Sequence, residues 1–199
     1  MIVSAARSGA SADWALAQRC AAGDRAAQRQ LFDEQRTRVH LVLYRILGSN
    51  HEIEDLVQEA FVRIFRSLGR YRGEASLSTW VDRITARTAF RYLSSRPTQA
   101  VRLELLSSAA DAVPEEELQL RDIARRLYAV LDRLAPKYRI AYTLHAIDER
   151  PLSEVAEITD VSVVAAKSRV WRARRMLKRL ARSDQVLNEF LAGRRRSAR

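Results

Sequence analysis

The sequence predicts an all-α protein of two small helical domains joined by a flexible linker, and three observations support this fold class. Apolar residues recur at helical spacing through most of the 199 residues. No segment shows the alternation of apolar and polar residues that is typical of a half-buried strand. The helical spacing is lost between residues 96 and 116, where Pro97, Pro114 and a run of serines and alanines indicate the linker.

The charge of the chain indicates its class of partner. The sequence holds 35 Lys and Arg against 24 Asp and Glu, which gives a net charge of +11 and a pI near 10.7. Such an excess favours a polyanionic partner such as DNA. No apolar run reaches the 18 residues of a membrane span, and no signal-peptide core is seen. The lone Cys20 excludes an internal disulfide, so we expect a reducing, cytoplasmic location.

Motifs of enzymes and of metal sites are not found in the sequence. It has no glycine-rich phosphate loop, no Ser-His-Asp order and no HExxH pattern. His40, His51 and His145 do not stand at ligand spacing from Cys20, so we expect no metal. We therefore predict a protein without catalytic residues, cofactors or a small-molecule substrate.

The first half of the chain predicts four helices. Residues 1–11 are small and polar and are expected to be disordered, and a short helix follows from Ala12 to Ala22. A long helix runs over residues 25–47 and ends at Gly48, a residue common just after a helix. Asn50 then caps a third helix over residues 51–68.

The third helix has the most regular pattern in the protein. Its apolar residues repeat at i, i+3, i+4 and i+7 without a gap. A second face carries residues at the same spacing, namely Asp55, Gln58, Glu59 and Val62. One partner could contact all four, although solvated faces usually have this composition too. A carboxylate metal cluster on this helix lacks a second motif to complete it.

A polar loop over residues 69–78 leads into the fourth helix, which Ser78 or Thr79 is expected to cap and which runs to about Ser94. Arg83, Arg87 and Arg91 form a basic stripe at one-turn intervals beside Trp80. Basic tracks next to aromatic residues suit single-stranded nucleic acid, because bases stack and phosphates are neutralised. Taken singly, Trp80 is more often a core residue.

The second domain ends in two helices joined by a tight turn. Helices are expected over residues 117–134, with Leu120 on the buried side, and over residues 138–147. A short helix then begins after Pro151, and the turn at residues 159–162 contains Asp160, which tolerates left-handed backbone, and the N-cap Ser162. This is the helix-turn-helix arrangement, whose second helix enters the DNA major groove.

The helix after Ser162 is strongly basic. Residues 167–182 hold eight basic side chains and no acidic one. One face is apolar, while the opposite face is expected to be exposed and carries Val164, Lys167, Ser168, Trp171 and Arg175, with Arg172 beside it. An amphipathic helix with a solvated basic face is the alternative, but the preceding helix and turn favour DNA binding.

Three segments, in this order, resemble the sigma-70 family of bacterial RNA polymerase subunits, in its extracytoplasmic-function (ECF) group. The segments are DLVQEAFVRIFRSL from Asp55, YRGEASLSTWVDRITARTAFRYL from Tyr71, and the last helices from Leu131 to Leu177. The resemblance covers about residues 13–181. It implies a core-polymerase-binding helix, a segment that melts and reads the −10 promoter element, and a domain that reads the −35 element.

The resemblance also implies a role for each matching residue. Asp55, Gln58, Glu59 and Val62 are expected to contact core RNA polymerase. The −10 DNA is expected to contact Arg72, Ser76, Ser78, Thr79, Trp80, Arg83, Arg87 and Arg91. The −35 DNA is expected to contact Lys167, Ser168, Arg169, Trp171, Arg172 and Arg175. Asp160, Ser162 and Trp171 depart from the usual residues of the family, which leaves the −35 sequence preference open.

The expected domains are a region 2-like domain over 12–95, a linker over 96–116, a region 4-like domain over 117–182 and a basic tail over 183–199. The expected function is promoter-specific transcription initiation, and the family adds an anti-sigma factor as a regulator, often at the membrane. The alternative is a stand-alone helix-turn-helix repressor or activator. Such a protein would need neither the segment from Asp55 nor that from Tyr71.

Overall fold

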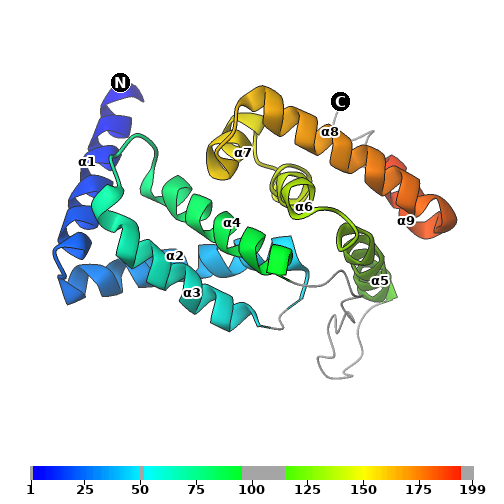
Figure 1. Cartoon of the computed structure of the whole chain (residues 1–199), viewed down its shortest axis with the longest axis horizontal. Helices are drawn as coiled ribbons and strands as arrows, with labels where there is room; N and C mark the ends of the chain where they lie inside the picture. The colour runs from blue at the N-terminus through cyan, green and yellow to red at the C-terminus, as the bar shows by residue number, and fades with distance from the viewer. Residues whose placement is uncertain (1, 50–51, 96–114, 194–199) are drawn as a thin grey trace.

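The computed structural model confirms the all-α class. It describes the backbone of residues 2–49, 52–95 and 115–193, and the side chains of residues 12–49, 52–95 and 117–192. Figure 1 shows the first four helices on one side and the C-terminal helices on the other. Helix α4 of the first group and α7 of the second lie where the two groups meet. Residues 96–114 of the predicted linker and the predicted cap Asn50 lie outside the described residues, and the last two residues of that linker already belong to a helix. No described helix is long and apolar enough to cross a membrane.

The helices follow the predicted order. The N-terminal helices are α1 (Ile2–Ala21), α2 (Arg25–Leu47), α3 (Ile53–Ser67), the 3₁₀ turn η1 (Leu68–Arg70) and α4 (Leu77–Ser95). The C-terminal helices are α5 (Glu115–Leu131), α6 (Pro136–Tyr142), the π-helical turn η2 (Thr143–Ile147), α7 (Leu152–Thr159), α8 (Val163–Leu180), the 3₁₀ turn η3 (Ala181–Ser183) and α9 (Gln185–Gly193).

Local chemistry fixes both ends of α2. The Asp24 carboxylate accepts hydrogen bonds from the backbone N–H groups of Ala26 and Ala27 and pairs with Arg19 at 2.7 Å. The bond from Ala27, followed by that from Arg19, lowers the pKa of Asp24 below its usual value. At the other end Gly48 has φ +71°, a left-handed conformation that glycine adopts without strain, and its N–H bonds to the Tyr44 carbonyl.

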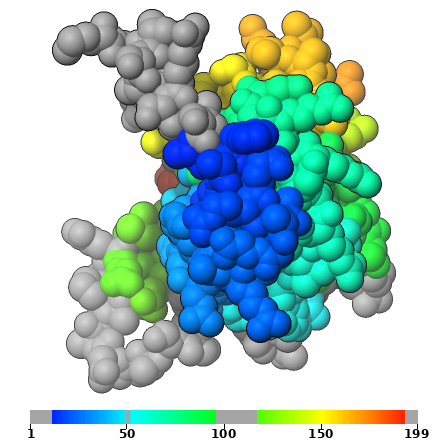
Figure 2. Space-filling view, turned by 90° about the vertical axis from the view of Figure 1, so that its left-hand side faces the viewer, coloured from blue at the N-terminus to red at the C-terminus, as the bar shows by residue number. Residues whose placement is uncertain are grey.

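The apolar core is continuous between the two groups of helices. One buried cluster contains α3 residues such as Phe61 and Ile64, and extends to Leu144, Val155 and Ile158 of the C-terminal helices. The helix α4 packs on α2 and α3 on one side and on α7 and α6 on the other. A second cluster joins α5, α6, α8 and α9. Figure 2 shows α1, in blue, on the outside of the N-terminal helices, away from α8 and α9 in Figure 1.

The structure differs from the sequence predictions at both ends of the chain. Helix α1 begins at Ile2 rather than near Ala12; its first ten residues contain three alanines and Arg7, which favour a helix, and no proline that would interrupt one. The predicted basic tail contains α9, whose residue Leu187 is fully buried against α5. Leu120 was predicted to be buried but is 62% exposed, because tight packing of α5 begins only at Leu127.

The packing of α9 can be tested by stability. Removing the buried side chain in Leu187→Ala leaves a cavity, so we expect the free energy of unfolding to fall by about 2–5 kcal/mol. The matched control is Val186→Ala, which truncates an exposed neighbour and should change stability by less than about 0.5 kcal/mol. Equal effects of the two changes in urea unfolding would show that α9 does not pack as described.

Candidate interfaces with nucleic acid and a protein partner

The outward face of α3 is available to a partner. Asp55, Gln58 and Val62 are exposed, and Val62 keeps 47% of its surface accessible despite being apolar. Glu59 is half-buried and accepts a hydrogen bond from its neighbour Arg63 at 2.9 Å. Opposite them the apolar side of α3 is buried in the core. The four residues therefore share one face, as the spacing predicts.

The loop before α4 is held in place by hydrogen bonds of Ser76 and Tyr71. Ser76, not Ser78 or Thr79, caps α4: its hydroxyl accepts from the Thr79 N–H at 3.1 Å and also contacts the Thr79 hydroxyl. The next N–H, of Leu77, donates to Asp13 of α1 at 2.8 Å. The Tyr71 hydroxyl donates to the Ala75 carbonyl and closes the loop. The helix consequently starts earlier than predicted, because two separate acceptors satisfy its first donors.

Two further residues of the predicted −10 set have partners within the protein. The Ser78 hydroxyl accepts a hydrogen bond from Gln35 at 3.3 Å. Trp80 packs edge-on against Tyr71, with ring centroids 5.6 Å apart, and is half-buried. Arg72, in contrast, lies exposed in the loop. In this state of the protein, therefore, Trp80 supports the loop.

The basic stripe of α4 faces the C-terminal helices. Arg83 donates to the Glu157 carbonyl at 3.0 Å, and Arg87 pairs with the Asp160 carboxylate at 2.8 Å. Arg91 is exposed one turn further along. Partial burial and the neighbouring Arg63 lower the pKa of Arg91 below its usual value. Arg83 and Arg87, the first two members of the stripe, therefore contact the helix-turn-helix.

The helix-turn-helix has the predicted geometry. Asp160 ends α7 in a left-handed conformation with φ +55°, and its N–H bonds to the Glu157 carbonyl. The Ser162 hydroxyl accepts from the Ala165 N–H at 3.2 Å and caps α8. Ala166, Val170, Ala173 and Leu177 form the buried face of α8. Asp160 and Ser162 thus supply the left-handed conformation and the cap that the turn requires.

The opposite face of α8 is exposed over its whole length. Lys167, Ser168, Trp171 and Arg175 all lie on it, and Trp171 keeps 58% of its surface accessible. The Arg175 guanidinium sits 5.5 Å from the centre of the Trp171 ring, a cation–π contact that holds the two side chains together. Trp171 therefore does not cover the first helix of the motif.

The remaining two predicted −35 residues lie beside this face. Arg172 is exposed and donates a hydrogen bond of 3.4 Å to the Tyr138 hydroxyl of α6. This donation lowers the pKa of Tyr138. Arg169 is half-buried. The structure thus brings the predicted −35 set together on α8, and it adds Tyr138 as a residue that positions Arg172.

Comparisons with known proteins agree with this geometry. Residues 31–97, from α2 to just beyond α4, match the family described as Sigma-70 region 2, and residues 116–177 match Sigma-70, region 4. The ECF RNA polymerase sigma factor SigW of Bacillus subtilis is 30% identical over 171 residues, which cover 80% of this chain and 91% of that protein. The chain belongs to the ECF RNA polymerase sigma factors.

Other relatives and solved structures are consistent with this family. The ECF RNA polymerase sigma-E factor of Haemophilus influenzae is 29% identical over 83% of this chain and 93% of that protein. The structure of CnrH, solved with the cytosolic domain of CnrY, matches with a TM-score of 0.61 at 24% identity, over 87% of this chain and 99% of that one. RpoE of Bartonella quintana, solved with the anti-sigma factor NepR, matches with a TM-score of 0.51 at 19% identity, over 79% of this chain and 98% of that one. These two structures support the fold.

This ECF sigma factor directs promoter-specific initiation by RNA polymerase, as the sequence predicted. The match to region 2 as well as region 4 favours that function over a stand-alone helix-turn-helix regulator.

Sequence reasoning missed several residues that organise the interfaces, which are Asp13, Asp82, Tyr138, Arg139 and Arg150. Each acts on a residue of another element, so no local spacing marks it. The one available signal was an acidic residue, Asp82, on the side of α4 that otherwise carries apolar residues and threonines.

The structural role of Ser76 leads to a stability prediction. Ser76→Ala removes the cap of α4, so we expect the free energy of unfolding to fall by about 1 kcal/mol. The control Ser94→Ala changes an exposed serine near the end of the same helix and should have little effect. If chemical unfolding showed no difference between the two variants, the hydroxyl would be free for DNA instead.

Proposed function

We propose that this sigma factor docks on core RNA polymerase through the outward face of α3 and contacts promoter DNA through α4 and α8. Asp55, Gln58, Glu59 and Val62 make up the polymerase-binding face. The exposure of this face opposite a buried apolar side supports the proposal, because a partner can bind there without disturbing the fold. The chain acts as a specificity subunit and has no catalytic activity of its own.

The DNA contacts divide between the two groups of helices. Arg83, Arg87 and Arg91 hold backbone phosphates near the −10 element, and the loop with Arg72 and Ser76 lies beside the opened strand. Ser78, Thr79 and Trp80 support that loop, and after opening they contact the bases. The α8 set, from Lys167 to Arg175, reads the −35 element. The observation that carries this assignment is the uninterrupted exposed face of α8 behind a capped helix-turn-helix.

The proposed domains are a region 2 domain over 12–95 and a region 4 domain that begins at residue 117. Because α9 packs on α5, we place the end of the second domain after α9 rather than at residue 182. An anti-sigma factor is the proposed regulator, supported by the fold shared with sigma factors solved with such partners. The proposed location is the cytoplasm.

The first experiment tests the polymerase-binding face. Asp55→Arg with Glu59→Arg reverses two charges on α3, so we expect binding to core RNA polymerase to be lost while circular dichroism stays helical. The control Asp33→Arg with Glu74→Arg makes the same change in charge at exposed sites off α3 and should bind normally. Co-elution of the α3 variant with core enzyme at wild-type affinity would contradict the assignment.

The second experiment tests α8 in holoenzyme, on a promoter selected by run-off transcription from random sequences. Lys167 lies near the start of α8, where side chains reach base edges, so Lys167→Ala should relax specificity at one −35 position by about 1–3 kcal/mol. Arg179 lies in the last turn, so Arg179→Ala should weaken binding to all sequences alike and reduce the salt slope by about one. Identical profiles for the two variants would refute this division.

A further inference from the structure

One large aromatic side chain of α1 is exposed to solvent. Trp14 keeps 50% of its surface accessible, although tryptophan side chains are highly buried on average. Single exposed apolar residues are common on proteins, so exposure alone assigns no role to this one. Trp14 also lies before residues 31–97, which match region 2, so its role does not follow from that match. The surroundings of the indole ring therefore decide what it can bind.

The indole ring of Trp14 borders the polar loop before α4. A Cβ atom built on Gly73 would lie 3.7 Å from Cδ1 of the ring, which is van der Waals contact. Gly73 has φ +72°, a left-handed conformation that favours glycine. No side chain at position 73 therefore stands between the ring and the loop. Figure 1 shows this loop, which connects η1 to α4, beside α1.

The residue next to Trp14 fixes α1 against this loop. The Asp13 carboxylate accepts a hydrogen bond from the Leu77 N–H at 2.8 Å, which ties α1 to the first turn of α4. Ser76 caps the same turn, and the Tyr71 hydroxyl closes the loop. Trp14 is thus held next to the loop before any ligand binds. Such pre-organisation reduces the entropy that is lost on binding.

The other two aromatic side chains at this loop pack on each other. Tyr71 is only 4% exposed, and the half-buried Trp80 packs edge-on against it. Their packing leaves little open ring surface for a base. Of the three rings, that of Trp14 has the most exposed surface. A base that stacks at this loop without rearranging it therefore stacks on Trp14.

The loop also offers positive charge for a phosphate. Arg70 and Arg72 are exposed, and neither forms an ion pair with any residue that the structure describes. Glu74 is the one acidic residue between positions 69 and 78, so the segment has a net positive charge. An exposed aromatic ring beside unpaired guanidinium groups is the combination that binds single-stranded nucleic acid.

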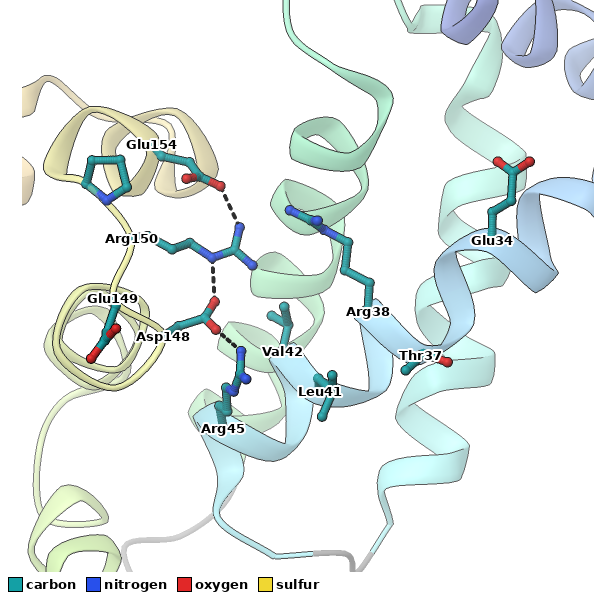
Figure 3. A pocket seen from close by; sticks show the side chains of 11 residues that line it. Glu34, Thr37, Arg38, Leu41, Val42, Arg45, Asp148, Glu149, Arg150 and Glu154 are labelled. Carbon is teal, nitrogen blue, oxygen red and sulfur yellow. Dashed lines mark hydrogen bonds and ion pairs between the residues drawn. The ribbon is translucent and has the colours of Figure 1, made fainter. Parts of the chain in front are cut away.

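A groove of about 620 Å³ between α2 and the residues before α7 lacks this combination. Figure 3 shows its arginines beside carboxylates: Arg45 pairs with Asp148, and Arg150 pairs with Asp148 and Glu154. None of the residues that line the groove is aromatic, and its exposed apolar residue is Leu41. A single strand would have to displace carboxylates there and would find no ring for its bases. The loop beside Trp14 is therefore the better site for an unpaired base.

We propose that Trp14 is the stacking residue for an unpaired base of the non-template strand at the −10 element, with Arg72 bound to a neighbouring phosphate. The proposal rests on the assignment of this loop to the opened strand. Stacking tolerates any base, because every base has a π-face. Sequence is selected instead by contacts to base edges. Trp14 therefore favours opened over paired DNA without choosing among bases.

The test uses holoenzyme and a single-stranded oligonucleotide with the non-template sequence of the selected −10 element. In a series of such oligonucleotides, 2-aminopurine replaces one base at a time within the element and on its flanks. This adenine analogue loses fluorescence when it stacks, so it reports which base contacts a ring. Affinity is measured separately, by the anisotropy of a fluorescein-labelled strand. Trp14→Leu removes the aromatic ring but keeps an apolar side chain, whereas Trp14→Phe keeps an aromatic ring.

We expect one position to be quenched in the wild type, to lose this quenching in Trp14→Leu and to keep it in Trp14→Phe. Trp14→Leu should lower the affinity for the strand by about fivefold or more, and Trp14→Phe by less than about threefold. The preference among the bases should not change. Circular dichroism should stay helical in both variants, because half of the Trp14 surface already lies in water.

The control Leu41→Ala truncates an exposed apolar side chain on α2 and should bind within about twofold of the wild type. Wild-type quenching and affinity in Trp14→Leu would overturn the stacking role and leave the proposed function intact. An equal loss of affinity in Trp14→Phe, or a changed base preference, also contradicts stacking, because a residue that merely supports the loop would give this result.

Two further outcomes assign the fault elsewhere. Weaker assembly of Trp14→Leu with core polymerase, with unchanged strand binding once assembled, would place Trp14 at a protein contact and overturn its role on DNA. If wild-type holoenzyme bound the −10 strand no better than a scrambled strand, the proposed −10 role of the loop would be wrong, and the stacking role would fail with it.

Discussion

The carboxylate of Asp82 is the contact on which the arrangement of the two helical groups depends. It is completely removed from solvent and is compensated by Arg38 from its own group and Arg150 from the other. A buried charge that loses its partners is strongly destabilising, whereas a fully paired one adds little net stability, because desolvation offsets much of the attraction. Asp82 therefore fixes the position of α7 on α4 more than it adds net stability.

The end of α2 is a second place where the N-terminal helices depend on contacts from the C-terminal helices. Gly48 adopts a left-handed conformation, and a Cβ there would lie 2.1 Å from the Tyr128 ring, so only glycine allows α5 to approach. Arg139 then reaches the last carbonyls of the helix. A solvent-exposed helix end would hydrogen-bond to water instead. Here side chains of the C-terminal helices donate hydrogen bonds to the last carbonyls of α2, and these bonds join the C-terminal helices to the N-terminal helices.

The fold was largely predictable from the sequence, because helix periodicity and capping residues are local signals. Gly48 and Ser162 were recognised as helix boundaries, and the exposed face of α8 followed from its spacing. Contacts between distant residues were not predictable. The 3.6-residue period on α4 marks Asp82 only as an anomaly, and nothing local indicates that Arg150 is its partner. Helix α9 was missed because Leu187 is buried only through tertiary packing with α5.

The candidate sites show the same difference between local and distant signals. Spacing and resemblance place their residues on helix faces, but they do not indicate which side chains are hydrogen-bonded to other parts of the protein. Arg83 and Arg87 lie where the pattern puts them, yet both are engaged by the turn around Asp160. The aspartate at that turn therefore links α4 to the helix-turn-helix through its ion pair with Arg87.

The most direct measurement is the distance between the two helical groups before and after promoter binding. Spin labels at Arg66→Cys on α3 and Arg179→Cys on α8 would both be exposed. Cys20 is buried, and burial raises the pKa of its thiol, so it should label poorly. Double electron–electron resonance should give one distance in the free chain and a distance tens of ångströms longer in holoenzyme on a promoter. The same distance in both states would contradict the account.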